Sequence, residues 1–129
     1  EDALSDTRIL SISKNSQFDL SGNRILYVGG RQRLIGRLQT LVRNWNGILD
    51  HHDGGIDQSM RELNQAISKA DVVVFPIDCV SHNAVNRVKQ ICNHTMKPFA
   101  PLRSTGLGSL ILGLQNGLKH FALSAHQNR

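Results

Sequence analysis

The sequence predicts an α/β fold: a small open parallel sheet of about four strands with helices on both faces. Short apolar runs alternate with stretches of helical apolar spacing, in the order β-α-β-α-β-α-β-α. The run at 72–77, Val-Val-Val-Phe-Pro-Ile, is continuous and mostly β-branched, as in a strand that is buried on both faces. The 129 residues suffice for one compact core. We expect the strand order 2-1-3-4, with 3-2-1-4 as the alternative.

The first half of the domain is expected to start at Arg24. An apolar strand at 25–28 closes at Gly29-Gly30, and a helix with its apolar residues at helical spacing follows and ends at Gly47. A second strand opens at 48–49 and runs into a cluster of histidine and aspartate. Residues 1–23 are expected to be a lead-in segment or the end of a missing N-terminal region, because the first residue is Glu1 rather than Met.

The second half continues the alternation. Asp57 or Ser59 is expected to cap the second helix and Ser81 the third, ahead of a last strand at 99–102. Pro101 removes a donor from that strand, which favours an edge position. The inward faces of the three helices are expected at Met60, Leu63, Ile67 and Ala70, at Val85, Val88, Ile91 and Cys92, and at Leu107, Leu110, Ile111, Leu114, Leu118 and Phe121. The domain should extend to 123, and 124–129 should be a polar tail.

Composition favours an anionic partner. The formal net charge is +5 and the pI is near 9.8. A solvated basic surface is the alternative, because the chain has no block of five or six like charges. Two cysteines make a disulfide framework unexpected and indicate a reduced, cytoplasmic protein. No apolar run approaches the roughly 18 residues of a membrane span, so we expect no membrane partner.

Polar motifs follow each of the four predicted strands. They are Gly29-Gly30-Arg31, His51-His52-Asp53-Gly54-Gly55, Asp78-Cys79-Val80-Ser81-His82 and Arg103-Ser104-Thr105-Gly106. In open parallel sheets ligands bind outside the carboxyl ends of the strands, so these loops should share one crevice. With the order 2-1-3-4, the histidine and cysteine loops lie roughly 10 Å apart, on either side of the glycine pair.

The histidine pair is a candidate ligand set for a transition metal or haem. Adjacent strand residues point to opposite faces, so His51 and His52 should not both face the crevice, and we prefer His52. A structural hydrogen bond to a neighbouring carboxylate is the alternative for either ring.

Cys79 and His82 are the second candidate set. Their spacing of three would place them on one face at the start of the third helix, where the helix N-terminus favours a thiolate. A thiolate and an imidazole can bind zinc, iron or haem. They can also act as a nucleophile and its base. A buried cysteine that packs as a small hydrophobic residue is the remaining alternative.

Two further motifs suit an anion. Gly29 and Gly30 would leave a bare floor with backbone N–H groups available, next to Arg31. Arg103, Ser104 and Thr105 offer a guanidinium and two hydroxyls at a helix N-terminus, although Ser104 or Thr105 could instead be an ordinary cap. The spacings of a dinucleotide fingerprint, a Walker loop and a phosphatase loop are absent, and an acidic pair for a receiver domain is missing.

The combination of Tyr27-Val28-Gly29-Gly30, the 51–55 motif, Pro76-Ile77 with the 78–82 motif, and Pro101-Leu102 with Arg103-Ser104-Thr105-Gly106-Leu107 resembles an uncharacterised bacterial domain family of unknown function. The resemblance runs from Arg24 to the last helix. It implies a small Rossmann-like or flavodoxin-like domain and no settled activity. Members often form the C-terminal part of a longer chain. This chain has Thr105 where a second serine is expected.

These observations favour a ligand-binding or sensory domain that holds a transition metal (zinc or iron), haem or a small anionic ligand, in a homo-oligomer such as a dimer. One alternative is an enzyme in which Cys79 is the nucleophile and His82 the base. Another is a nucleic-acid or protein-interaction module on Arg31, Arg33 and Arg37. Nucleic acid is not favoured, because only Tyr27 and Trp45 lie near those arginines and no aromatic platform is interleaved with them.

Overall fold

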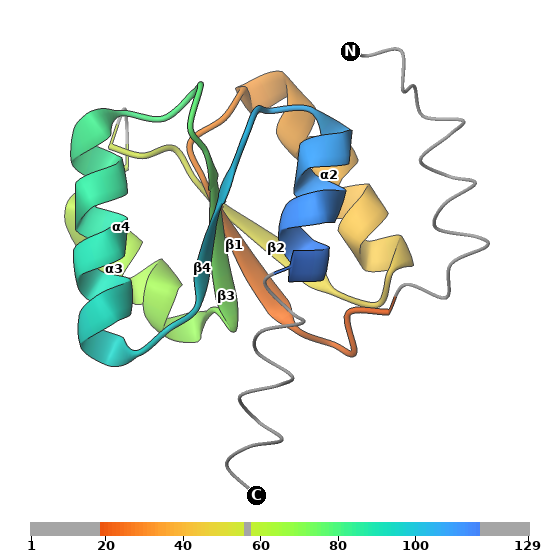
Figure 1. Cartoon of the computed structure of the whole chain (residues 1–129), viewed down its shortest axis with the longest axis horizontal. Helices are drawn as coiled ribbons and strands as arrows, with labels where there is room; N and C mark the ends of the chain where they lie inside the picture. Colours follow the sequence, from red (N-terminus) through yellow and green to blue (C-terminus); the bar gives the residue numbers. More distant parts are fainter. Residues whose placement is uncertain (1–18, 56–57, 117–129) are drawn as a thin grey trace, which may run out of the picture.

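The computed structural model describes residues 19–55 and 58–116. Four parallel strands form one sheet in the order β2-β1-β3-β4, which confirms the preferred order and the α/β class (Figure 1). The strands are β1 (Arg24–Val28), β2 (Ile48–His52), β3 (Val72–Pro76) and β4 (Phe99–Leu102). The carboxyl ends of all four strands therefore lie at one edge of the sheet.

The central strands carry the longest apolar runs, because both of their faces are covered by helices. All five residues of β3 are buried, and so are the last four of β1. The outer strands are less apolar. Pro101 lies in β4 at one edge of the sheet, where its missing N–H is tolerated as expected.

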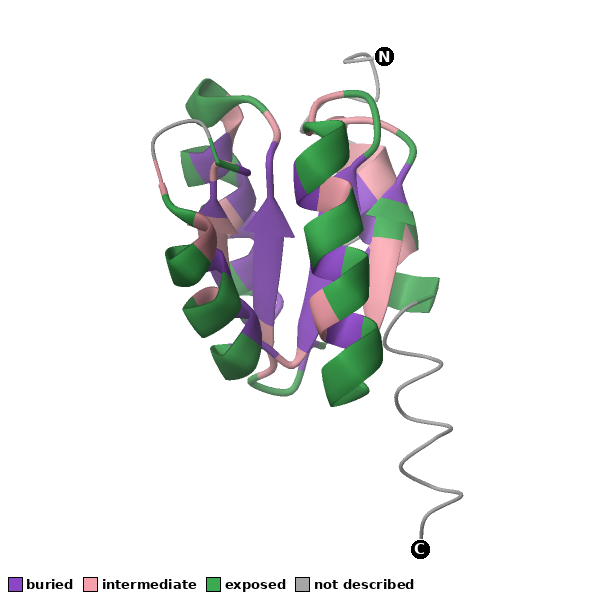
Figure 2. Ribbon diagram, turned by 90° about the vertical axis from the view of Figure 1, so that its left-hand side faces the viewer, coloured by how far each residue is buried: buried purple, intermediate pink, exposed green. Residues whose placement is uncertain are grey.

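Helices cover both faces of the sheet. On one face lie α2 (Gln32–Asn44) and the helix at 107–116, which pack with Tyr27 and Leu49 around a first core cluster. On the other lie α3 (Met60–Lys69) and α4 (His82–Thr95), which pack with Leu26 and Val28 around a second. Figure 1 shows this division, and Figure 2 views the molecule from the side of α3 and α4, with buried strands behind exposed helix surfaces. Among the described helices, none is long and apolar enough to cross a membrane.

The helix caps follow the sequence signals closely. Ser59 accepts from the amide of Glu62 and completes a capping box at α3, and Ser81 accepts from the amide of Ala84 at α4. The end of α2 differs from the prediction. The left-handed residue there is Asn46, at φ 63°, rather than Gly47. Gly47 is needed for a different reason, since a Cβ at this position would lie 2.6 Å from Leu20 Cδ1.

Residues 19–23 pack on the domain. The Leu20 side chain is fully buried in the first cluster, and its amide donates to the carbonyl of Trp45. The last helix places Leu110, Ile111 and Leu114 in the core and packs Leu107 against it. The remaining inward residues expected on that helix, Leu118 and Phe121, lie outside the described residues, as do the predicted cap Asp57 and the tail 124–129.

Candidate functional site

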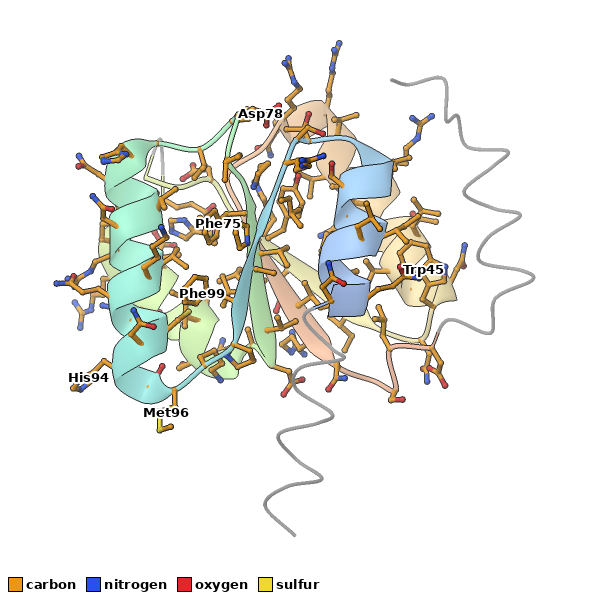
Figure 3. The ribbon with its side chains drawn as sticks, viewed as in Figure 1. Trp45, Phe75, Asp78, His94, Met96 and Phe99 are labelled. Atoms are coloured by element: carbon orange, nitrogen blue, oxygen red, sulfur yellow. The ribbon has the colours of Figure 1, made fainter. Side chains whose placement is uncertain are left out.

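The four polar loops lie at the carboxyl edge of the sheet but divide between its two faces. The loops after β1 and β4 lead into α2 and the helix at 107–116 on one face. The loops after β2 and β3 lead into α3 and α4 on the other. We call the first pair of loops the basic half of the edge and the second pair the packed half. Figure 3 places Asp78 at this edge, at the end of the molecule opposite to His94 and Met96.

His52 belongs to the packed half, and its ring is enclosed. The side chain is 1% exposed. Its Nδ1 accepts from the Gly54 amide at 3.0 Å, so the ring carries its proton on Nε2 and donates it to the Ser59 carbonyl at 2.9 Å. The 4.0 Å approach of Asp53 to Nδ1 is consequently no ion pair in this tautomer. The ring that we preferred as facing the crevice thus has both nitrogens engaged by backbone, and it ties β2 to the cap of α3.

His51 points to the other face, as strand alternation requires. It pairs in register with Tyr27 of β1, and the two ring centroids lie 6.5 Å apart. Its Nε2 lies 2.9 Å from the Gly29 carbonyl. The ring is half-buried, and one nitrogen has a backbone partner.

The glycine pair does not form the expected bare floor. The Gly29 amide donates to the His52 carbonyl, and the Gly30 amide donates to the Cys79 carbonyl. Both glycines have positive φ, and a Cβ on Gly29 would lie 2.7 Å from Val80 Cβ. The glycines are therefore needed because the loop after β3 packs directly onto them, and neither amide is available to an anion.

The packed half is closed by contacts among three loops. The Ser81 hydroxyl reaches the Gly54 carbonyl at 3.4 Å while it caps α4. A Cβ on Gly54 would sit in ordinary contact with Ala84 and Val80 and close to Gly29 Cα. Asp53 in turn accepts from the amides of Gly55 and Gln58. These polar groups hold the loops in place.

Cys79 and His82 do not share a helical face, because α4 starts at His82 and Cys79 precedes its cap by two residues. Cys79 is half-buried and His82 is exposed. Because Ser81 was expected to cap this helix, the sequence already indicated that Cys79 lies outside it. Across the described part of the chain, no three His, Cys, Asp or Glu side chains gather so that they could hold a metal ion. The donor set proposed for a metal or haem is thus not assembled at one point.

Tyr27 is a site residue that sequence reasoning did not single out. Its ring is buried on the face of the sheet that carries α2, against Gly30. Burial raises the pKa of the Tyr27 hydroxyl, and the charges of Asp78 and Cys79 raise it further. The loop after β3 therefore presents Asp78 and Cys79 near this hydroxyl. The register with His51 is the signal that could have identified Tyr27.

The start of α2 carries the chemistry of the basic half. Arg31 is the N-cap residue, it makes no capping hydrogen bond with its side chain, and no acidic residue stands in the first turn. The amide of Leu34 already bonds to the Arg31 carbonyl, whereas the amides of Gln32 and Arg33 have no acceptor among the described residues. Arg31 and Arg33 are both exposed. Two cations thus stand at the positive end of a helix dipole, where an acidic residue is normally favoured.

The loop after β4 adds a third cation to the basic half. Arg103 is exposed, and the Ser104 hydroxyl accepts from the Gly106 amide and bonds to the Ser109 hydroxyl at 2.9 Å. Ser104 therefore shapes the turn ahead of the helix. Thr105 is half-buried beside it. Since β1 and β4 are separated by one strand, Arg103 and Arg31 leave the sheet roughly 10 Å apart.

Comparison with protein families adds the identity of the domain. The model of a family described as "Uncharacterized protein conserved in bacteria (DUF2325)" matches residues 24–116. The chain belongs to DUF2325. The match spans the whole sheet of this DUF2325 domain, from β1 into the last helix, and agrees with the resemblance seen in the sequence. No curated protein and no solved structure matches the chain.

Proposed function

We propose that this DUF2325 domain binds a small anionic ligand, such as a metabolite with a phosphate or carboxylate group, at the basic half of the sheet edge. The observation that carries the proposal is the start of α2. Its two arginines and two free amides meet the positive end of the helix dipole, and no acidic side chain of the first turn offsets them. Such a helix start costs stability when it is empty, and an anion would relieve that cost.

Neighbouring groups would select among anions. Arg103 faces the same edge from the loop after β4 and could contact a second anionic group. Tyr27 is 1% exposed and lies beneath the site, and the exposed carboxylate of Asp78 bounds the site on the side toward β3. These neighbours favour an elongated ligand whose anionic group lies at α2.

The test is a calorimetric titration with pyrophosphate at low ionic strength, since salt screens exposed charges. Saturable binding is expected, and Arg31→Gln or Arg33→Gln should weaken it about fivefold. Arg43→Gln is the matched control, because Arg43 is an exposed arginine in the last turn of the same helix. Absence of saturable binding would contradict the proposal. So would an equal loss in the control, because a diffuse basic surface would then explain the binding.

A second variant separates binding from folding. Arg31→Asp places a favoured N-cap residue and a negative charge at the start of α2 and should raise stability by about 1 kcal/mol. The same change should weaken pyrophosphate binding by about tenfold or more. A stability gain with unchanged binding would place the anion elsewhere.

The other hypotheses stay predictions. Ligation of zinc, iron or haem by His51, His52, Cys79 and His82 would require rearrangement of the hydrogen bonds of His52, and an absorption spectrum taken after haem addition would test it. Catalysis by Cys79 with His82, a nucleic-acid partner, a homo-oligomer and a cytoplasmic location have tests of their own: covalent labelling, salt-dependent binding, sedimentation and cell fractionation.

A further inference from the structure

The face of the sheet opposite to α2 is covered by α3 and α4. A hollow of about 670 Å³ runs between α3 and α4, and it is lined by Asn64, Ile67, Ser68, Arg87, Gln90, Ile91, His94, Thr95 and Lys97. We call it the α3/α4 groove. Its volume falls within the range of small-molecule sites. His94, one of the lining residues, lies at the end of the molecule opposite to the sheet edge that carries Asp78 (Figure 3).

The groove combines an apolar floor with basic walls. Ile91 is partly buried and presents aliphatic surface, and Ile67 lies beneath it in the second core cluster with 1% of its side chain exposed. Every lining residue that can be charged is basic, namely Arg87, His94 and Lys97. The remaining lining side chains are two amides and two hydroxyls. The amides of Asn64 and Gln90 can donate hydrogen bonds, whereas the hydroxyls of Ser68 and Thr95 already donate to the carbonyls of Gln65 and Ile91.

Favourable interaction with helix C-termini explains the positions of Lys97 and His94, but not the position of Arg87. The Lys97 ammonium donates to the Ala70 carbonyl at the end of α3, and His94 stands in the last turn of α4, where cations are favoured. Arg87 lies in the first half of α4, and its guanidinium donates to the side-chain oxygen of Gln90, a neutral amide, at 3.4 Å. No described carboxylate forms an ion pair with it.

The C-terminal part of the sequence is also strongly basic. No Asp or Glu follows Asp78, whereas the same stretch holds six Lys and Arg: Arg87, Lys89, Lys97, Arg103, Lys119 and Arg129. α4 has no acidic residue anywhere along its length. The field over the groove therefore favours negative ligands.

We propose that the α3/α4 groove binds a small amphipathic organic anion, with its apolar body on Ile91 and its charged group near Arg87. The size of the groove favours a small molecule over a helix of a partner protein. Arg87 and His94 are seven residues apart on α4, which is a span of roughly 10 Å and only two turns. This site is independent of the proposed anion site at α2.

The probe for the test is anilinonaphthalenesulfonate, whose aromatic body and single sulfonate match this description. Titration of the folded chain should give saturable fluorescence, and Arg87→Gln should weaken the affinity about fivefold. Lys89→Gln is the matched control, because Lys89 is an exposed cation on α4 that does not line the groove. The uncharged analogue N-phenylnaphthylamine should bind without responding to Arg87→Gln.

A second measurement locates the probe. Backbone amide shifts on titration should concentrate at 64–68 and 87–97, and Arg31→Gln should leave the affinity unchanged. Three results would overturn the proposal: no saturable binding, an equal loss in Lys89→Gln, or shifts concentrated outside these ranges. Circular dichroism of each variant ensures that a lost signal reflects the groove and not unfolding.

Discussion

His52→Leu is the substitution that most directly tests the structural role of the histidine cluster. Leucine has a similar volume but no polar atoms, so the change removes both hydrogen bonds of the enclosed ring. The Gly54 amide is buried and loses its acceptor, which costs about 1–3 kcal/mol. The Ser59 carbonyl keeps the Leu63 amide as a donor, so its loss adds only about 1 kcal/mol. The total is roughly 2–4 kcal/mol, or roughly 10–20 °C in Tm.

Urea unfolding followed by circular dichroism at neutral pH measures the change. His51→Leu is the control, since that ring is half-buried and has one backbone contact, and it should cost about 1 kcal/mol. The reasoning would be refuted if His52→Leu cost no more than His51→Leu. Repeating both measurements with a chelator tests the metal hypothesis. If His52 binds a metal, the chelator should lower the stability of the wild type and leave that of His52→Leu unchanged.

Three further outcomes are expected. Gly29→Ala should cost about 2–4 kcal/mol in urea unfolding, because its Cβ would meet Val80 at 2.7 Å, while Gly22→Ala, which has positive φ but open space, should cost about 1 kcal/mol. A thiol reagent at neutral pH should modify half-buried Cys79 first, so Cys79→Ala should remove the fast phase and Cys92→Ala should keep it. Burial raises the pKa of Cys92 from 9.0 to about 11, so the unfolded chain loses this proton first, and Cys92 should lower stability by about 2–3 kcal/mol as pH rises between these values. Cys92→Ala should remove this part of the slope, while the raised pKa of Tyr27 leaves a further fall above pH 10.

Strand order and helix faces could be predicted because their signals are local and repeated. The β-branched run of β3 marks a strand covered on both sides, and Pro101 marks an edge. Two serines at the expected caps set the starts of α3 and α4. The end of α2 was less predictable, because Asn46 can adopt the left-handed conformation that glycine usually takes.

The loops could be assigned to the right edge but not to their contacts. The parallel topology alone places them there, whereas hydrogen-bond partners depend on loop conformations that have no periodic signal. The Gly29-Gly30 pair illustrates this limit. Glycine often adopts the positive φ that both residues have. The close packing that also excludes a side chain at Gly29 comes from Cys79 and Val80, on a loop about fifty residues away in sequence.

The division of the sheet edge into two halves gives opposite expectations for mutations in loops that look alike in sequence. Ser81 and His52 are joined to neighbouring loops by hydrogen bonds, so their substitution should alter stability. Arg31 and Arg103 are exposed, and the free energy of unfolding should be insensitive to their removal or should increase. The proposed anion at α2 would give these two exposed arginines a role in binding rather than in folding. The basic half is therefore where a ligand of this domain should first be sought.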